Sequence, residues 1–201
     1  MNNRLEEITL ALLEMIKKDI SLQNELEKTI DLDEGYHPKL ESLHLENAEE
    51  LQRIIYEIGW STVAKVGPEA AYAAWLILQH AISSPSLQRD NLPLLMELAN
   101  KNEIYPSEVA VLYDRICYFE FRPQKYGTQF EFDENDELSP WEIEDMNLVD
   151  SYRKQVGLPP LEETIKRMRE IVKKTNEKPT KSYKERIKER TEWAKKVGWI
   201  E

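Results

Sequence analysis

Cysteine and long hydrophobic runs are scarce in this sequence of 201 residues. No run reaches the about 18 apolar residues that a membrane-spanning helix needs, so we expect no membrane span. The single cysteine, Cys117, cannot form an internal disulfide, which fits a reducing compartment. Residues 1–7 lack the basic and then apolar pattern of a secretory signal. We therefore expect a cytoplasmic protein.

Positive charge is also scarce over most of the chain. The net charge is −11 overall, with −16 over residues 1–160 and +5 over residues 161–201. An acidic body repels the phosphates of DNA and RNA, so nucleic-acid binding is disfavoured. The basic C-terminal segment has two candidate partners, an acidic protein or the acidic body of its own chain, and we favour the second.

Known catalytic and metal-binding motifs are missing. There is no P-loop, dinucleotide fingerprint or nucleophile elbow. Four residues have the spacing of a calcium loop, namely Asp133, Asn135, Glu137 and Glu144, but Leu138 stands where that loop needs glycine. His37 and His44 lie in an acidic segment without cysteine or a zinc-peptidase pattern. We therefore predict no metal and no cofactor, and we interpret Cys117 as a buried, inert thiol.

Hydrophobic periodicity predicts mostly helices. The predicted helices cover residues 3–30, Ala48–Ile58, Pro68–Ile82, Pro93–Ala99, Ser107–Phe119, Asp145–Val156, Leu161–Lys174 and Ser182–Val197. The segment Pro68–Ile82 is apolar on all sides, which is typical of a helix at the centre of a bundle. Near Gln129–Phe132 the period changes to two, and Leu138–Ile143 is the returning strand of a hairpin.

The predicted fold class is therefore mainly α, a multi-helix single domain with one short β-hairpin and a basic C-terminal helix. We place the helical domain at residues 1–175. A linker and the basic helix follow at residues 176–201.

The loop Arg122–Phe130 is the densest group of polar side chains. Pro123 restricts φ, and Gly127 allows a turn or a close approach to a ligand. In a functional interpretation the cations bind an anionic group of a ligand, while the amides, the phenol and the hydroxyl form hydrogen bonds with the rest of the ligand. In a structural interpretation the same side chains tie the preceding helix end to the hairpin, and composition alone favours this second interpretation.

Two pairs of polar residues interrupt the apolar helices. Gln79 and His80 end the buried helix, where His80 is either a general acid or base or a satisfied core histidine. Asp114 and Arg115 lie in the apolar helix before the loop, where they either pair within the chain or line a polar cavity.

Several short motifs occur in a recognisable order. They are Gly59-Trp60, Gln79-His80-Ala81, Asp114-Arg115, and Arg122-Pro-Gln followed by Tyr-Gly-Thr-Gln. In this order the chain resembles a bacterial family of uncharacterised proteins with GW, QHA, DR and RPQxYGTQ motifs. The resemblance spans about residues 50–160 and implies a shared site without naming its chemistry. The segment after about Asn176 looks like an addition.

Two functions follow as hypotheses. In the first, the loop and the ends of the two apolar helices converge on a pocket for a small polar or anionic ligand, with metal-independent hydrolysis or group transfer as the reaction. His80 is then the general base and Asp114 its orienter or an alternative acid. The ligand-binding residues are Gln79, Arg115, Arg122, Gln124, Lys125, Tyr126, Thr128 and Gln129. The alternative is a non-catalytic interaction protein of immunity, inhibitor or sequestering type, which contacts a protein partner through its acidic body or its basic C-terminal helix.

Overall fold

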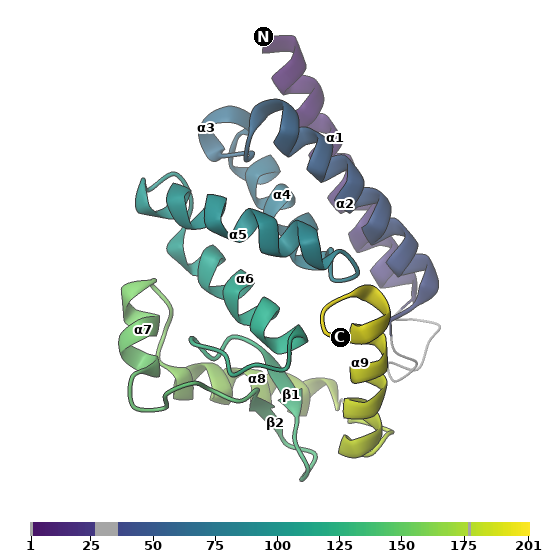
Figure 1. Cartoon of the computed structure of the whole chain (residues 1–201), viewed down its shortest axis with the longest axis vertical. Helices are drawn as coiled ribbons and strands as arrows, with labels where there is room; N and C mark the ends of the chain where they lie inside the picture. Colours follow the sequence, from purple (N-terminus) through teal and green to yellow (C-terminus); the bar gives the residue numbers. More distant parts are fainter. Residues whose placement is uncertain (1, 27–35, 177) are drawn as a thin grey trace. The chain divides into compact units, whose positions relative to one another are not determined.

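The computed structural model describes residues 2–26, 36–176 and 178–201. Within these residues the chain is mainly helical and has one two-stranded antiparallel sheet, which confirms the predicted fold class (Figure 1). The chain divides into two compact units, Met1–Ile104 and Tyr105–Glu201. No helix among the described residues combines the length and apolar character that a membrane span requires.

The first unit consists of helices, and the second adds a hairpin. The first holds α1 (Asn2–Leu26), α2 (Pro38–Ile58), α3 (Val63–Val66), α4 (Pro68–His80) and α5 (Pro85–Asn100). The second holds α6 (Pro106–Phe119), β1 (Phe130–Phe132), β2 (Leu138–Pro140), α7 (Val149–Gln155), α8 (Leu161–Thr175) and α9 (Tyr183–Val197). In the hairpin Glu131 lies opposite Ser139.

Helix α4 is the centre of the first unit, as its apolar sequence predicts. It contacts α1, α2, α3 and α5. Ala70, Ala73 and Ala74 are all buried, and their small side chains let the neighbouring helices approach closely. The end of this helix, with Gln79 and His80, is therefore positioned by the core itself.

Helix α2 begins earlier than the sequence predicted. We expected an acidic loop before Ala48, but the helix starts at Pro38, which occupies a first-turn position where its missing N–H is no loss. The Nδ1 atom of His37 accepts a hydrogen bond from the backbone N–H of Lys39 at 3.2 Å and caps the helix. His44 consequently lies on a helix and is buried.

The predicted start of helix α5 was wrong. The helix begins at Pro85 and continues through Pro93, the residue at which the sequence predicts its start. Proline inside a helix removes one backbone hydrogen bond. Leu87 and Leu95 are both buried, and their burial on either side of Pro93 favours a continuous helix. The last part of the predicted first helix, residues 27–30, lies outside the described residues.

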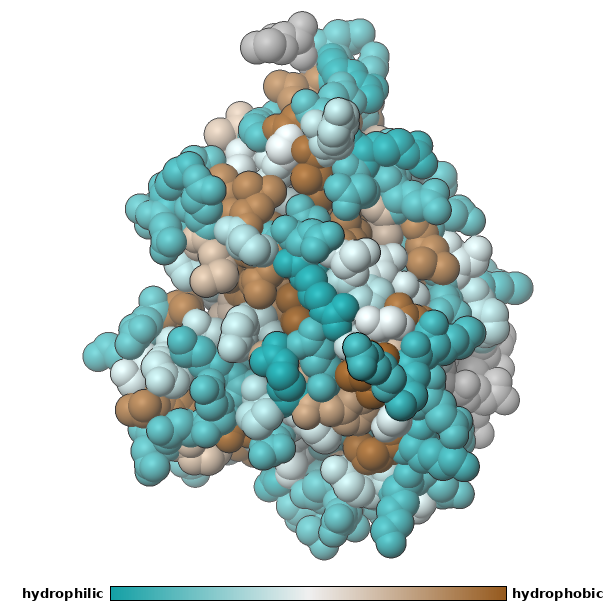
Figure 2. All heavy atoms as spheres, in the orientation of Figure 1, coloured by the Kyte–Doolittle hydropathy of each residue, from teal (hydrophilic) through white to brown (hydrophobic). Residues whose placement is uncertain are grey.

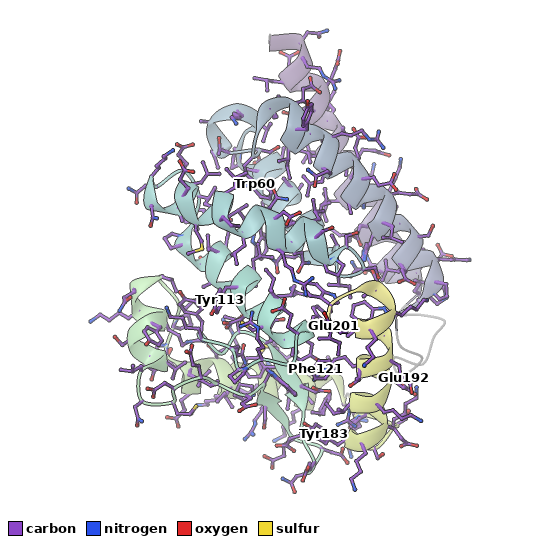
Figure 3. All side chains as sticks on the ribbon, viewed as in Figure 1. Trp60, Tyr113, Phe121, Tyr183, Glu192 and Glu201 are labelled. Atoms are coloured by element: carbon purple, nitrogen blue, oxygen red, sulfur yellow. The ribbon has the colours of Figure 1, made fainter. Side chains whose placement is uncertain are left out.

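Helix α9 packs within the second unit. The ring of Trp199, just beyond its end, stacks on Phe119 with 5.3 Å between the centroids. The guanidinium of Arg190 lies 4.1 Å from the ring centroid of Tyr118 and donates to the carboxylate of Glu131 at 2.5 Å. Figure 3 labels Tyr183, the first residue of this helix. The second compact unit, residues 105–201, thus includes α9. The boundary at residues 175–176 stays a prediction.

The surface has the polar character that the composition predicts. Hydrophilic residues cover most of the face seen in Figure 2, with smaller hydrophobic patches between them. Helix α1 illustrates the contrast between its two faces, because Leu10 is 68% exposed whereas Leu12 is completely buried.

These two leucines provide a matched test of the core. We expect Leu12→Ala to lower the free energy of unfolding by about 3 kcal/mol, because it removes buried methyl groups and leaves a cavity. We expect Leu10→Ala to change it by less than about 0.5 kcal/mol. Urea denaturation of both variants measures the difference, and equal midpoints would contradict the burial of Leu12.

Candidate functional site

A cluster of ionisable side chains is buried in the first unit. Asp19 on α1, His44 on α2 and His80 on α4 form what we call the histidine–aspartate cluster. The Nε2 atom of His44 lies 3.0 Å from Oδ1 of Asp19, and Nδ1 of His80 lies 2.7 Å from Oδ2. The two imidazole rings have centroids 5.1 Å apart. One carboxylate therefore joins two histidines from different helices.

Burial differs within the cluster. The side chain of Asp19 is completely buried and that of His44 is 6% exposed, but that of His80 is 27% exposed. Within the described residues Nε2 of His80 has no hydrogen-bond partner, while its Nδ1 atom is held by the carboxylate. His80 is therefore the most exposed side chain of the cluster, and its Nδ1 atom is the one that contacts Asp19.

The carboxylate of Asp19 is ionised at neutral pH. Burial by itself raises the pKa of Asp19, but hydrogen bonds from His44, His80 and Gln23 outweigh burial and hold the pKa well below its ordinary value. The Nε2 atom of Gln23 donates to Oδ1 at 2.6 Å. A stable negative charge thus lies between the two imidazoles.

Tyr36 extends the cluster. Its hydroxyl forms a short hydrogen bond with Nδ1 of His44 and a longer one, at 3.5 Å, with the backbone carbonyl oxygen of His80. Burial, followed by the charges of Glu41 and Asp19, raises the pKa of this phenol, so it stays protonated. Tyr36, His44, Asp19 and His80 form a continuous hydrogen-bonded chain.

In the second unit, Asp114 organises the loop Arg122–Phe130. Its Oδ1 atom accepts hydrogen bonds from the backbone N–H groups of Lys125 and Tyr126 at 2.9 and 3.0 Å. Its Oδ2 atom accepts from the backbone N–H and the hydroxyl of Thr128, at 2.9 and 3.0 Å. Burial raises the pKa of Asp114, and these donors offset part of that effect. The loop is folded around this carboxylate, so we call it the anchored loop.

Further side chains support the anchored loop from within. The amide of Gln124 donates to the backbone carbonyls of Gln129 and Trp141 and accepts from the backbone N–H of Gln129, all at 2.9 Å. The buried guanidinium of Arg153 donates to the carbonyls of Tyr126 and Gly127. These contacts match the structural interpretation of the loop.

Gly127 is required where it stands. Its φ is +65°, a backbone conformation that residues with a side chain rarely adopt. A Cβ atom there would lie 2.8 Å from Cδ1 of Leu161 and 3.1 Å from Cδ1 of Ile143. The close approach is thus to the chain's own leucine and isoleucine side chains.

The remaining predicted ligand-binding residues of the second unit have their surroundings within that unit. Arg122 forms an ion pair with Glu120 at 2.6 Å. The ammonium of Lys125 lies 4.5 Å from the ring centroid of Tyr152, and burial lowers the pKa of Arg115 without removing its charge at neutral pH. Gln129 donates to the hydroxyl of Thr128 at 3.1 Å.

The predicted site residues thus fall in both units. Gln79 and His80 belong to the first unit, and the others belong to the second. Within the second unit the structure brings Asp114 together with Lys125, Tyr126 and Thr128. The predicted convergence of His80 with the loop, and the binding role of all these residues, stay predictions.

Sequence reasoning missed Asp19 and Tyr36 and considered His44 only as a partner of His37. A signal for Asp19 was present, because it continues the helical spacing of Ile8, Leu12 and Ile16, which are core positions. A charged residue on an apolar stripe needs a buried partner. No comparable signal marks Tyr36.

The fold and the site define a mainly helical protein with a buried histidine–aspartate cluster in one unit and a carboxylate-anchored loop in the other. The chain belongs to a family of unknown function (DUF6624), whose model matches residues 9–174. This confirms the resemblance to uncharacterised proteins, and the match includes both the cluster and the loop. No curated protein and no solved structure matches the chain.

The role of Asp114 can be tested by removing its carboxylate. We expect Asp114→Ala to lower the free energy of unfolding by about 3 kcal/mol, because three backbone N–H groups and a hydroxyl lose their acceptor. The control is Glu144→Ala, which removes an exposed carboxylate from the same unit and leaves stability nearly unchanged. Urea denaturation reports both values, and equal losses in the two variants would show that Asp114 does not hold the loop.

Proposed function

We propose that this protein binds a small polar or anionic ligand at the histidine–aspartate cluster and acts on it by general acid–base catalysis, without a metal. Hydrolysis or group transfer is the reaction class. The observation that carries the proposal is the 2.7 Å contact between Oδ2 of Asp19 and Nδ1 of His80, an imidazole that is partly exposed. We also propose that the protein works in the cytoplasm of a bacterium.

The role of Asp19 follows from the two nitrogens of an imidazole. In neutral His80, Nδ1–H donates to the carboxylate, so the lone pair is on Nε2 and can accept a proton from a substrate or a water molecule. After that transfer, the negative charge of Asp19 stabilises the imidazolium. Asp19 takes the orienting role that we first assigned to Asp114, whose oxygens accept hydrogen bonds from the anchored loop.

His44 and Tyr36 support this arrangement from the other side of Asp19. His44 donates through Nε2 to Oδ1, which leaves Oδ2 for His80. Because Tyr36 bonds to Nδ1 of His44, it selects the tautomer that donates to Asp19. We assign positioning roles to both residues, since neither needs to contact the ligand.

The partly exposed cations Arg122 and Lys125 remain proposed contacts for an anionic group, on the second unit. Arg122 pairs with Glu120, and Lys125 lies over the ring of Tyr152. Contacts of partly exposed charges are weak, so an anionic group can replace them.

A non-catalytic interaction protein is the second candidate. The net charge of −16 over residues 1–160 favours a basic partner. Such association should weaken with added salt and should depend on exposed carboxylates such as Glu46 on α2. The buried Asp19 with its two histidines has no role in that function, so we favour the catalytic proposal.

A general-base role makes His80 essential for turnover. In a panel of chromogenic carboxylic and phosphoric esters, we expect wild-type protein to hydrolyse at least one member. We expect His80→Gln to lower its kcat on the order of 100-fold or more, since positioned proton transfer contributes about that much. Asp19→Asn should give a loss of similar size through a misoriented imidazole.

The matched control is His37→Asn. It removes the remaining histidine of the chain and keeps a side chain suited to cap α2, so kcat should not change. Circular dichroism and thermal melting show whether each variant is folded. Full activity in folded His80→Gln, or unfolding of that variant, would return His80 to a structural role.

A further inference from the structure

The histidine–aspartate cluster has the composition of a metal site. Asp19, His44 and His80 each offer one ligand atom, and these atoms lie within 4.8 Å of one another. Two imidazoles and one carboxylate are typical ligands of zinc and related metals. The three residues are far apart in the chain, so no local spacing indicates this site, and the sequence predicts no metal.

We propose that the histidine–aspartate cluster binds one divalent transition-metal ion, with Zn²⁺ as the probe, through a carboxylate oxygen of Asp19, Nε2 of His44 and Nδ1 of His80. This site goes beyond the proposed function, because it needs no substrate. The metal-free and metal-bound clusters are alternative states of one site, and only the metal-free state can carry out the proposed acid–base reaction. Once Nδ1 of His80 donates its lone pair to a metal, the proton must lie on Nε2, which can then no longer act as a base.

The distances suit a metal of this size. Zinc forms bonds of about 2.0–2.2 Å to nitrogen and oxygen, so two ligand atoms at a tetrahedral angle lie about 3.3 Å apart. The contacts from Asp19 to His44 and to His80 are 3.0 and 2.7 Å, so they must lengthen by about 0.3 and about 0.6 Å to admit the ion. The widest separation, within 4.8 Å, must shorten by at most about 1.5 Å. His80 is the most exposed of the three side chains, so packing restricts it least.

Charge also favours a cation here. Asp19 is completely buried, and its hydrogen-bond donors among the described residues are Gln23, His44 and His80, none of which carries a permanent positive charge. A buried carboxylate without a compensating cation is costly. A divalent ion between the carboxylate and two neutral imidazoles supplies that compensation.

The surrounding groups resemble the supporting shell of a metal site. Metal-bound histidines usually hydrogen-bond through their other ring nitrogen, which sets the tautomer and the ring orientation. Nδ1 of His44 has such a partner in the hydroxyl of Tyr36. Gln23 holds Oδ1 of Asp19 in the same way. Three protein ligands leave the fourth position of a tetrahedral ion for water.

Isothermal titration of tag-free, EDTA-treated full-length protein with Zn²⁺ alone tests the proposal. We expect saturable binding of one ion per chain and a higher melting temperature with Zn²⁺. Asp19→Asn, His44→Gln and His80→Gln should each weaken binding on the order of 100-fold, because each removes a ligand. His37→Asn should bind as tightly as wild type, and Mg²⁺ should not bind, since it prefers oxygen ligands.

Three results would overturn the site. They are the absence of saturable Zn²⁺ binding by wild type, wild-type affinity in the ligand variants, and an equal loss in His37→Asn. If a ligand variant does not fold, Tyr36→Phe replaces it, with a loss of about 10-fold expected from the missing hydrogen bond to His44 and no loss counting against the site. The assay contains no substrate, so the ester assay can fail while metal binding succeeds, or the reverse.

Discussion

The buried carboxylate of Asp19 is the interaction on which the first unit depends. It joins α1 to α2 through His44 and to α4 through His80, so one side chain connects three helices. Leaving such a carboxylate unpaired would cost several kcal/mol, and this penalty ties the helices to a single register. Because α4 contacts every other helix of the unit, its end cannot shift without disturbing the core. The geometry that acid–base or metal chemistry needs is therefore maintained by ordinary packing.

The two units each contain one completely buried aspartate among the described residues, and their donors differ in kind. Asp114 accepts from backbone N–H groups and a hydroxyl, which keep their protons near neutral pH. Asp19 accepts from two imidazoles, each of which has a second ring nitrogen besides the one that contacts the carboxylate. The first arrangement builds a loop and the second can do chemistry. This difference explains why the most distinctive sequence motif, the anchored loop, is the weaker candidate for a reacting centre.

How well each part of the structure could be predicted from the sequence depends on how far apart its interacting residues lie in the chain. The central helix and the hairpin follow local patterns, namely an apolar segment beginning at Pro68 and an alternation of period two, and both were predicted. The start of α5 was not, because Pro85 and Pro93 carry the same local signal and only buried packing on both sides of Pro93 distinguishes them. The histidine–aspartate cluster joins α1, α2 and α4, and no spacing rule connects positions so far apart. Placing the start of α2 too late also hid His44 in a supposed loop.

Part of the charge difference between the acidic body and the basic C-terminal segment is balanced by ion pairs within the second unit. Arg190 of α9 pairs with Glu131 of the hairpin, and Arg169 of α8 pairs with Glu137 at 3.1 Å. The basic C-terminal segment thus neutralises acidic groups of its own unit, as the sequence favoured, and some of the negative charge over residues 1–160 is compensated internally. An acidic surface for a basic partner must then be sought among carboxylates without such pairs. The net charge of a segment does not identify such a surface, because the same carboxylates can pair within the chain or attract a partner.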